Sequence, residues 1–310
     1  MTLDASVVLV SDYKAGDEKS WNDVRKALRG LASQYTSGAF EVLLVENERY
    51  LERLPPDLEY IVPGLRIVPS CRTSSYGLKN EGVRAAKAAT VCLIDADCVP
   101  AESWIGSCLQ AFERRPDAAV VSGLTRYPGR TLTERCLALL LRSYVDDGRR
   151  CDIVRISNNN AAYRRDAYLA APLPEDEGAF ASRLQAQAIL RSGGALLFEP
   201  GMVVIHDFEG WDMERDARAA MAHGLITVRR RDPSIPFSWV VRLGEAGIPI
   251  FYAGRVLISL WKCVTVARHY DVKPWQVPYA MLLALVVHAM EVPGALAALR
   301  DRTIGQTVYR

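Results

Sequence analysis

The sequence predicts an α/β protein whose mostly parallel sheet is flanked by helices and followed by a C-terminal helical region. Short, continuously apolar runs alternate with helical patterns up to about residue 121, which is typical of parallel strands buried on both faces. Two aspartates follow one of these runs, and such sheets bind ligands at the carboxyl ends of their strands. Beyond about residue 215, long apolar stretches replace the alternation.

The elements are predicted along the chain from these patterns. Strands are expected at 6–11, 40–45, 65–68, 90–94, 118–121 and 202–205, and helices at 21–34, 80–89 and 104–114. The strand runs are rich in Val, Leu and Ile, whereas the helical segments space their apolar residues three or four apart. We expect a domain over 1–215, with a nucleotide-binding half at about 1–100 and an acceptor half at about 101–215, and then a helical region over 216–310.

Composition limits the partners and the compartment. Among 310 residues, 38 Lys and Arg balance 36 Asp and Glu, so no basic face for nucleic acid is expected. The seven cysteines form no CxxC pair, which favours reduced thiols over a disulfide framework or a zinc site. The first ten residues lack the pattern of a signal peptide. We therefore expect a cytoplasmic protein, or one on the cytoplasmic face of a membrane.

The C-terminal region contains two long apolar stretches, 248–267 and 277–292. Arg255, Lys262 and His269 recur every seven residues in and just after the first stretch, so on a helix they share one face. This spacing favours an interfacial helix in peripheral contact with a membrane. Packing in a soluble core or in a homo-oligomer, and true membrane spanning, are the alternatives.

The segment with the clearest chemistry is the strand at 90–94 and the turn after it. Asp95 ends the strand and Asp97 lies two residues on. Two carboxylates so close repel one another unless a cation lies between them, and oxygen ligands suit Mg²⁺ or Mn²⁺. Alternatively, Asp97 caps a helix starting near Ala101 in a solvated turn.

The residues before this pair resemble a known family. They include Lys79, Asn80, Gly82 and Ala88. With Asp95 and Asp97, this stretch resembles the Arg-Asn-x-Gly, Ala-x-Gly and Asp-x-Asp pattern of the inverting glycosyltransferases called family two, which adopt the GT-A fold. Lys79 and Ala88 depart from it. The resemblance implies a nucleotide-diphosphate-sugar donor, which we expect to be a UDP-sugar, contacted by Lys79, Asn80 and Asp95, with Mn²⁺ or Mg²⁺ on the two aspartates.

The resemblance extends to other segments. Glu46 follows the second strand where the family usually has an acidic pair that grips the nucleoside, and Asp12 follows the first strand. We expect both to contact the donor, although Asp12 could instead start a turn. Asn160, Arg164 and Arg165 match the family's Asn-x-Ala-x-Arg-Arg segment, which implies that they line the acceptor side. The acceptor would be a glycan, a glycolipid or a related acceptor.

An inverting transfer needs a base that removes the proton of the acceptor hydroxyl on the face opposite the leaving diphosphate. The acidic cluster Glu175, Asp176 and Glu177 resembles the family's Glu-Asp motif. We expect Asp176 to be the base and Glu175 to be the second candidate; an exposed acidic helix start is the alternative. His206 follows the strand at 202–205 and is expected to contact the metal or the diphosphate, unless it is structural.

Other functions explain the sequence less well. A sugar-nucleotidyltransferase would need a Gly-rich loop after the first strand, where the chain offers only Gly16. An aspartate-dependent phosphatase usually has Thr where this chain has Val99, and a dehydrogenase needs a GxGxxG motif that is absent. A non-catalytic, membrane-associated protein that kept the fold is the remaining alternative. The sequence thus predicts a metal-dependent inverting hexosyltransferase.

Overall fold

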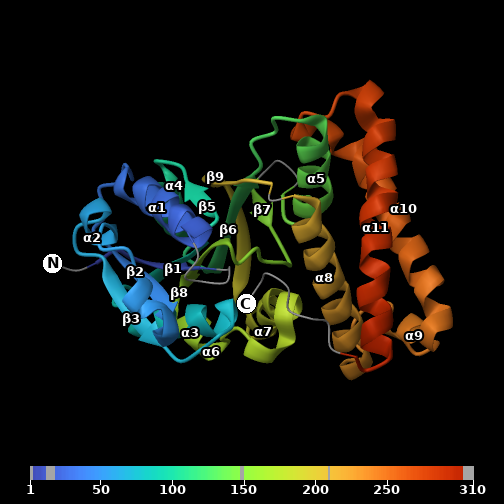
Figure 1. Ribbon diagram of the computed structural model, residues 1–310, viewed down its shortest axis with the longest axis horizontal. Coiled ribbons are helices and arrows are strands. Elements are labelled where there is room, and N and C mark those ends of the chain that lie inside the picture. Colours follow the sequence, from blue (N-terminus) through green and yellow to red (C-terminus); the bar gives the residue numbers. More distant parts are fainter. Residues whose placement is uncertain (1–2, 12–17, 147–149, 209, 303–310) are drawn as a thin grey trace.

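The computed structural model describes residues 3–11, 18–146, 150–208 and 210–302. A large sheet with its covering helices occupies one side of the molecule, and a group of long helices stands upright beside it (Figure 1). The strands of the sheet all come from residues up to 206, and most of the upright helices come from residues after 210 (Figure 1).

The described strands form one sheet in the order β3, β2, β1, β4, β8, β6, β9, β5, and β7 pairs with β9. The strands are β1 (Ala5–Val10), β2 (Phe40–Asn47), β3 (Arg66–Ser70), β4 (Thr90–Asp95), β5 (Cys98–Pro100), β6 (Ala118–Arg126), β7 (Cys151–Asp152), β8 (Asn160–Arg164) and β9 (Ala195–His206). The first four are parallel, and β6 is parallel to β9, while β8 runs antiparallel between β4 and β6. The predicted α/β class with a mostly parallel sheet is confirmed.

Helices cover both faces of this sheet. They are α1 (Glu18–Ala32), η1 (Glu48–Arg53), α2 (Leu58–Ile61), α3 (Ser75–Ala85), α4 (Trp104–Arg114), α6 (Arg165–Ala170), η2 (Glu175–Phe180) and α7 (Ala181–Arg191). Helix α5 (Leu132–Arg142) packs instead against the C-terminal helices. Alternate residues of β1 show the two faces: Val7 and Leu9 pack with α1 and α4, whereas Val8 and Val10 pack with α3, α6 and α7. This two-sided burial explains why the strands are continuously apolar in the sequence.

One predicted helix is shifted along the chain. The helix expected over 80–89 begins at Ser75, because the hydroxyl of Ser74 accepts a hydrogen bond from the N–H of Gly77 and caps the helix. It ends at Ala85, where Ala86 becomes extended and leads the chain into β4. The shift places Lys79 and Asn80 inside α3, on its buried side.

The C-terminal region consists of helices, as predicted. They are α8 (Trp211–Arg231), α9 (Ser238–Val241), η3 (Gly244–Ala246), α10 (Gly247–Thr265), η4 (Ala267–Tyr270), η5 (Pro274–Gln276) and α11 (Val277–Leu299). Helix α8 lies against α11, and α11 against α10 (Figure 1). Because α8 is continuous across residue 215, the fold does not mark the expected domain boundary there, and that boundary stays a prediction.

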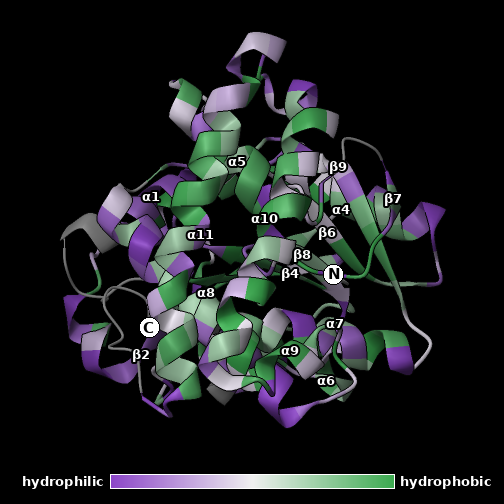
Figure 2. Ribbon diagram, turned by 90° about the vertical axis from the view of Figure 1, so that its right-hand side faces the viewer, coloured by the Kyte–Doolittle hydropathy of each residue, from purple (hydrophilic) through white to green (hydrophobic). Residues whose placement is uncertain are grey.

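The cationic face predicted on α10 points into the protein. Arg255 pairs with Glu291 of α11 at 2.9 Å, the amine of Lys262 donates to the hydroxyl of Ser143 at 3.2 Å, and His269 lies 2.8 Å from Asp146. The spacing correctly indicated a shared face, but partners from α11 and the segment after α5 cover it. The opposite face is apolar and exposed (Figure 2). It includes Ile250, Leu257, Trp261 and Val264 of α10 and Leu282, Leu285 and Val286 of α11.

Candidate active site

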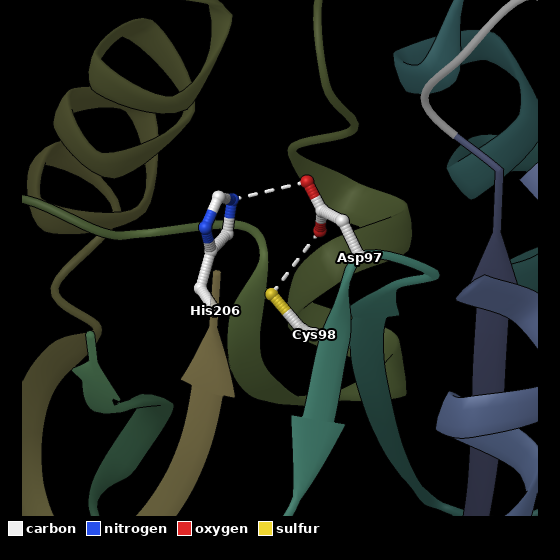
Figure 3. A group of neighbouring side chains, drawn as sticks. All are labelled: Asp97, Cys98 and His206. Carbon is white, nitrogen blue, oxygen red and sulfur yellow. Dashed lines mark hydrogen bonds and ion pairs between the residues drawn. The ribbon is translucent and has the colours of Figure 1, made fainter. Parts of the chain in front are cut away.

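The carboxyl ends of β4 and β9 bring two of the predicted metal ligands, Asp97 and His206, together, whereas the third, Asp95, pairs with Lys79. Asp95 ends β4 opposite Val10 of β1, and the next N–H, that of Ala96, donates to the carbonyl of Val10 at 2.9 Å. The chain then turns through Asp97 into β5, which pairs with β9 so that Cys98 lies opposite His206. Sheet register therefore places Asp97 beside His206, although 108 residues separate them in the sequence. Figure 3 shows the two side chains pointing toward each other.

Asp97 and His206 form a buried ion pair. The Nε2 atom of His206 lies 3.0 Å from Oδ2 of Asp97, and the two side chains are 12% and 6% exposed. Burial alone would raise the pKa of the Asp97 carboxyl, but the charge of His206 and its hydrogen bond hold that pKa at about 2. Burial likewise opposes the charge on His206, and Asp97 nevertheless raises its pKa above the usual value.

This pair has a geometry that a divalent cation could use. Neighbouring ligands of an octahedral ion, each bound at about 2.1 Å, lie about 3 Å apart, which matches the separation of the Asp97 oxygen and the His206 nitrogen. Cys98 is the third member of this group, whose ligand atoms lie within 4.8 Å of one another. Burial and the two neighbouring aspartates raise the pKa of the Cys98 thiol far above its usual range, so it is a poor ligand in this state. A carboxylate and an imidazole suit Mn²⁺.

Asp95 has a different partner. Its Oδ1 atom lies 2.5 Å from the amine of Lys79, and both side chains are almost fully buried. Lys79 also lies over the ring of Tyr76, with the amine 5.8 Å from the ring centre. Because the fold pairs Asp95 with Lys79 and Asp97 with His206, the two carboxylates at this strand end are each balanced by a cation.

These groups line one end of a large cavity of about 620 Å³. Lys79, Asp95, Asp97 and His206 belong to its wall, and the far wall is formed by side chains of α8, α10 and α11. The volume is typical of a small-molecule or cofactor site. The cavity therefore joins the sheet edge to the C-terminal helices.

Sequence comparison identifies the family. The model described as "Glycosyl transferase family 2" matches residues 15–170, which is half of the chain. The chain belongs to glycosyltransferase family 2. No curated protein sequence matches this glycosyltransferase significantly.

Solved structures share its fold. The mannosyltransferase PcManGT from Pyrobaculum calidifontis, in complex with GDP-Man and Mn²⁺, is 18% identical with a TM-score of 0.62, over 96% of this chain and 88% of that chain. GalNAc-T7 with UDP, GalNAc and Mn²⁺ is 14% identical with a TM-score of 0.51, over 72% of this chain and 48% of that one. TarS 1-349 from S. aureus is 12% identical with a TM-score of 0.50, over 96% and 91%. At these identities, the likeness shows the GT-A-like fold.

Asn80 of this glycosyltransferase connects α3 to the acidic cluster. Its side-chain nitrogen donates to the carbonyl of Leu173 at 2.9 Å and to Oε1 of Glu175 at 3.2 Å. Its oxygen accepts from the hydroxyl of Tyr168 and the N–H of Leu173. These four bonds use the full capacity of an amide, which indicates that Asn80 positions the segment carrying the predicted base. Its expected donor contact stays a prediction.

Two members of the acidic cluster are described, and both are ion-paired. Glu175 lies 3.2 Å from Arg72, and Glu177 pairs with Arg231 at the end of α8. The side chain of Asp176, the expected base, lies outside the described residues. Neither Glu175 nor Glu177 belongs to the cavity wall, so the assignment of the base stays a prediction.

The two predicted nucleoside contacts follow neighbouring strands. Glu46 lies near the carboxyl end of β2, is fully buried, and accepts a hydrogen bond from the N–H of Asn47 at 2.6 Å. Asp12 lies outside the described residues. Since β1 and β2 are adjacent and parallel, Glu46 and the carboxyl end of β1 lie at one edge of the sheet, and the expected contact of Asp12 stays a prediction.

The residues expected on the acceptor side do not meet at the cavity. Asn160 is buried and bonds Trp104 and the carbonyl of Met202. Arg164 lies opposite Thr90, at the start of β4, which is about 17 Å of strand away from Asp95. Arg165 donates to carbonyls of α3. Asn158 and Asn159, the two residues just before this segment, do line the cavity.

Sequence reasoning also missed residues that the cavity wall contains. Arg142 donates to the hydroxyls of Tyr127 and Ser157, and the Tyr127 ring lies 5.4 Å from that of His206. Arg218 and Glu214 of α8 line the opposite end. An amphipathic pattern on α8 could have indicated Arg218 and Glu214. Basic residues on several sides of that helix hide this pattern in the sequence.

Proposed function

We propose that this family 2 glycosyltransferase is a metal-dependent inverting enzyme that transfers a hexose from a nucleotide-diphosphate donor to a glycan, glycolipid or related acceptor. The observation that carries the proposal is the Asp97–His206 pair at the end of β4 and β9, at one end of a cavity large enough for a sugar nucleotide. The donor diphosphate would lie at this end, next to Lys79.

Each residue of this end has a distinct part in the proposal. Asp97 and His206 would hold Mn²⁺ or Mg²⁺, which supplies Lewis-acid stabilisation of the leaving diphosphate. Lys79, fixed by Asp95 at 2.5 Å, would place a second positive charge where negative charge develops. Asp176 would take the proton from the acceptor hydroxyl, held in its segment by the bonds between Asn80 and Glu175.

We propose UDP as the nucleotide, with GDP as the alternative. One structural relative carries GDP-Man and another carries UDP with GalNAc, each with Mn²⁺, so the fold accommodates both bases. The buried carboxylate of Glu46 at the nucleoside edge can accept a hydrogen bond from an N–H of either uracil or guanine, so a binding measurement has to decide between the two nucleotides.

The test is a calorimetric titration of the full chain with UDP and with GDP, each with and without Mn²⁺. Asp97→Ala should abolish the metal-dependent part of the binding. Asp117→Ala is the matched control, because Asp117 is 62% exposed and pairs only with its neighbour Arg115 among the described residues. Metal-dependent GDP binding without UDP binding would keep the enzyme class and replace the nucleotide. Metal-independent binding, or none, would overturn the proposal.

We also propose that the apolar face of α10 and α11 rests on the cytoplasmic face of a lipid bilayer. Gly244–Thr265 and Pro274–Leu299 are long and apolar enough to cross a membrane, yet their polar residues face protein partners, which favours lying on the bilayer. Trp239, Trp261 and Trp275 are each more than half exposed, and tryptophan is favoured where lipid meets water. A homo-oligomer formed through the same helices is the alternative.

A further inference from the structure

The end of the cavity formed by the helices is rich in arginine. Five arginines line it: Arg155, Arg183, Arg218, Arg229 and Arg255. They come from the segment before β8 and from α7, α8 and α10. Among the described residues, only two carboxylates, Glu214 and Glu291, pair with any of them. This part of the cavity thus holds more positive than negative charge.

Two of these arginines are neutralised. Arg218 is buried and bonds Glu214 at 2.6 Å and Glu291 at 3.3 Å. Arg255 binds both oxygens of Glu291, at 3.0 and 3.1 Å. The other acid at this end, Asp216, lies 3.5 Å from Arg215. These carboxylates of α8 and α11 therefore pair with Arg215, Arg218 and Arg255. None of them forms an ion pair with the three remaining arginines among the described residues.

Arg155, Arg183 and Arg229 rest on aromatic rings and carbonyl groups. The guanidinium of Arg155 lies 6.0 Å from the ring of Tyr144, and that of Arg183 lies 5.8 Å from the ring of Phe180. Arg229 donates to two backbone carbonyls. The buried Nε of Arg183 has no hydrogen-bond acceptor in the described part of the chain. Stacking fixes the planar groups while leaving N–H donors for a ligand.

The three groups are close enough to repel one another. Burial first, and then Arg183, Arg255 and Arg155, lower the pKa of Arg229 to about 10. Burial and the neighbouring charge of Arg255 lower the pKa of Arg155, and burial with Arg155 lowers that of Arg183. Clustered like charges are unfavourable until an anion lies among them. Guanidinium forks match the geometry of phosphate oxygens.

This cluster is separate from the donor end. The cations that act on Asp97 are His206 and Lys79. Arg142 belongs to the same end, because it donates to Tyr127, whose ring lies 5.4 Å from that of His206. A donor diphosphate at the sheet edge would be served by Lys79 and the metal. The arginines of the helical end are then free to bind a second anionic group on the other substrate.

The wall beside the arginines is apolar and continues to the outside of the molecule. Ile258 lines the cavity and is 53% exposed. It lies on α10 between the inward-facing Arg255 and Lys262 and the exposed Leu257 and Trp261. The charged group of a substrate could therefore bind among the arginines while its apolar chain passes Ile258 and lies along the outer face of α10 and α11 (Figure 2).

We propose that Arg155, Arg183 and Arg229 bind the phosphate group of an amphiphilic acceptor whose apolar chain leaves the cavity along α10. The proposal rests on the proposed function, because it gives the chemical class of the second substrate of the same cavity. The phosphate holds the acceptor at a fixed place relative to the donor end, and the chain keeps it in the lipid on which α10 and α11 rest.

The test uses decyl phosphate below its micelle concentration as the probe, titrated calorimetrically into the full chain. Inorganic phosphate and decyl glucoside, which lack the chain and the charge respectively, complete the series. Arg155→Gln and Arg183→Gln remove charges that hold no ion pair among the described residues. Arg191→Gln, also on α7 and exposed, is the matched control. UDP with Mn²⁺ is titrated into each variant as well.

Decyl phosphate should bind at least ten-fold more tightly than either partial probe, and each of the two substitutions should weaken it about ten-fold or more. Both variants and the control should bind UDP as the unmodified chain does. Equal binding of decyl glucoside, equal binding of inorganic phosphate, or insensitivity to both substitutions would overturn the proposal. Loss of UDP binding with Asp97→Ala alone tests the donor site, so failure of one proposal is distinguishable from failure of the other.

Discussion

The sheet and the C-terminal helices of this glycosyltransferase differ in where their charged and apolar side chains lie. At the sheet edge, Asp95, Asp97 and His206 follow apolar strands and line a cavity. In the helical region, Arg255 and Glu291 are turned inward, and the surface that faces away from the sheet is apolar (Figure 2). The sheet edge is arranged for a polar ligand. In the helices, charged side chains face the protein interior and apolar side chains face outward on one side. The two regions are therefore adapted to two different surroundings.

The largest expected effect on stability is that of breaking the inward charge network. Glu291→Gln leaves the buried Arg218 and the half-buried Arg255 without their shared carboxylate. Removing one partner of a buried ion pair typically costs about 3–5 kcal/mol. Urea unfolding, monitored by circular dichroism, should show a loss of this size in the free energy of unfolding.

Glu245→Gln is the matched control for this substitution. Glu245 pairs with Arg300 on the surface, where both side chains are about half exposed, and water and salt weaken such pairs, so the loss of stability should be small. Equal losses for the two variants would mean that the network of α8, α10 and α11 does not stabilise the helical region.

The same network predicts a pH dependence of stability. Burial opposes the charge of Glu291, but His288 of α11, Arg255 of α10 and Arg218 of α8 lower its pKa from 4.5 to about 2. A carboxyl with a depressed pKa stabilises the fold above its unfolded pKa, and this contribution disappears as pH falls from about 4.5 to about 2. The loss is about 3 kcal/mol in total. Between pH 5 and 3, the unmodified chain should lose stability more steeply than Glu291→Gln, and parallel curves would contradict the assignment.

The contrast also explains how much of the fold could be predicted. The sheet strands were recognisable because burial on both faces makes each run apolar, and α4 (Trp104–Arg114) has the predicted bounds. In the helical region the length and apolar character of α10 and α11 were readable as well. The direction of the cationic face was not, because Arg255 and Arg218 meet Glu291 across 36 and 73 residues of sequence. Periodicity gives a face and says nothing about what covers it.

A smaller effect is expected from the outward surface. Leu257 and Trp261 are 66% and 68% exposed on α10. Replacing both with Ser should weaken binding to vesicles of phosphatidylglycerol and phosphatidylcholine by roughly 10- to 100-fold, since each apolar side chain contributes about 1.5–3 kcal/mol when fully buried and roughly half of that when it is partly inserted at the bilayer surface. Stability should change by less than about 0.5 kcal/mol, as for other exposed positions.

Tyr60→Ser is the control for surface hydrophobicity. Tyr60 is 87% exposed on α2 (Leu58–Ile61), at the side of the molecule away from α10 (Figure 1). It should bind vesicles like the unmodified chain. If the double variant instead converts a dimer to a monomer in sedimentation and vesicle binding is unchanged, the apolar face is an interface between two copies.

The site was predictable to the extent that strand ends fix it. Asp97 and His206 were both proposed as metal ligands from their positions after strands, and the β5–β9 pairing brings them to 3.0 Å. The arginines at the other end of the cavity lie on four segments with no common spacing. Asn160 and Arg164 fit a motif, yet Asn160 bonds Trp104 in the core and β8 carries Arg164 along β4 to the start of that strand, away from the cavity. A motif gives the order of residues along the sequence. The strand pairing in the sheet determines at which end of a neighbouring strand each of them lies.

The smallest expected effect on binding comes from Arg165, which the motif assigned to the acceptor side. Its guanidinium donates to the carbonyls of Val83 and Arg84 at 3.1 and 3.0 Å and so fastens α6 (Arg165–Ala170) to α3. Arg165→Gln should therefore change the dissociation constants of decyl phosphate and of UDP with Mn²⁺ by less than about two-fold. It should lower the free energy of unfolding by about 1–2 kcal/mol, because two carbonyls lose their donor. Arg183→Gln should do the reverse, weakening decyl phosphate binding with little change in stability. A ten-fold loss of decyl phosphate binding in Arg165→Gln would show that the acceptor site lies on the sheet side of the molecule and not among the C-terminal helices.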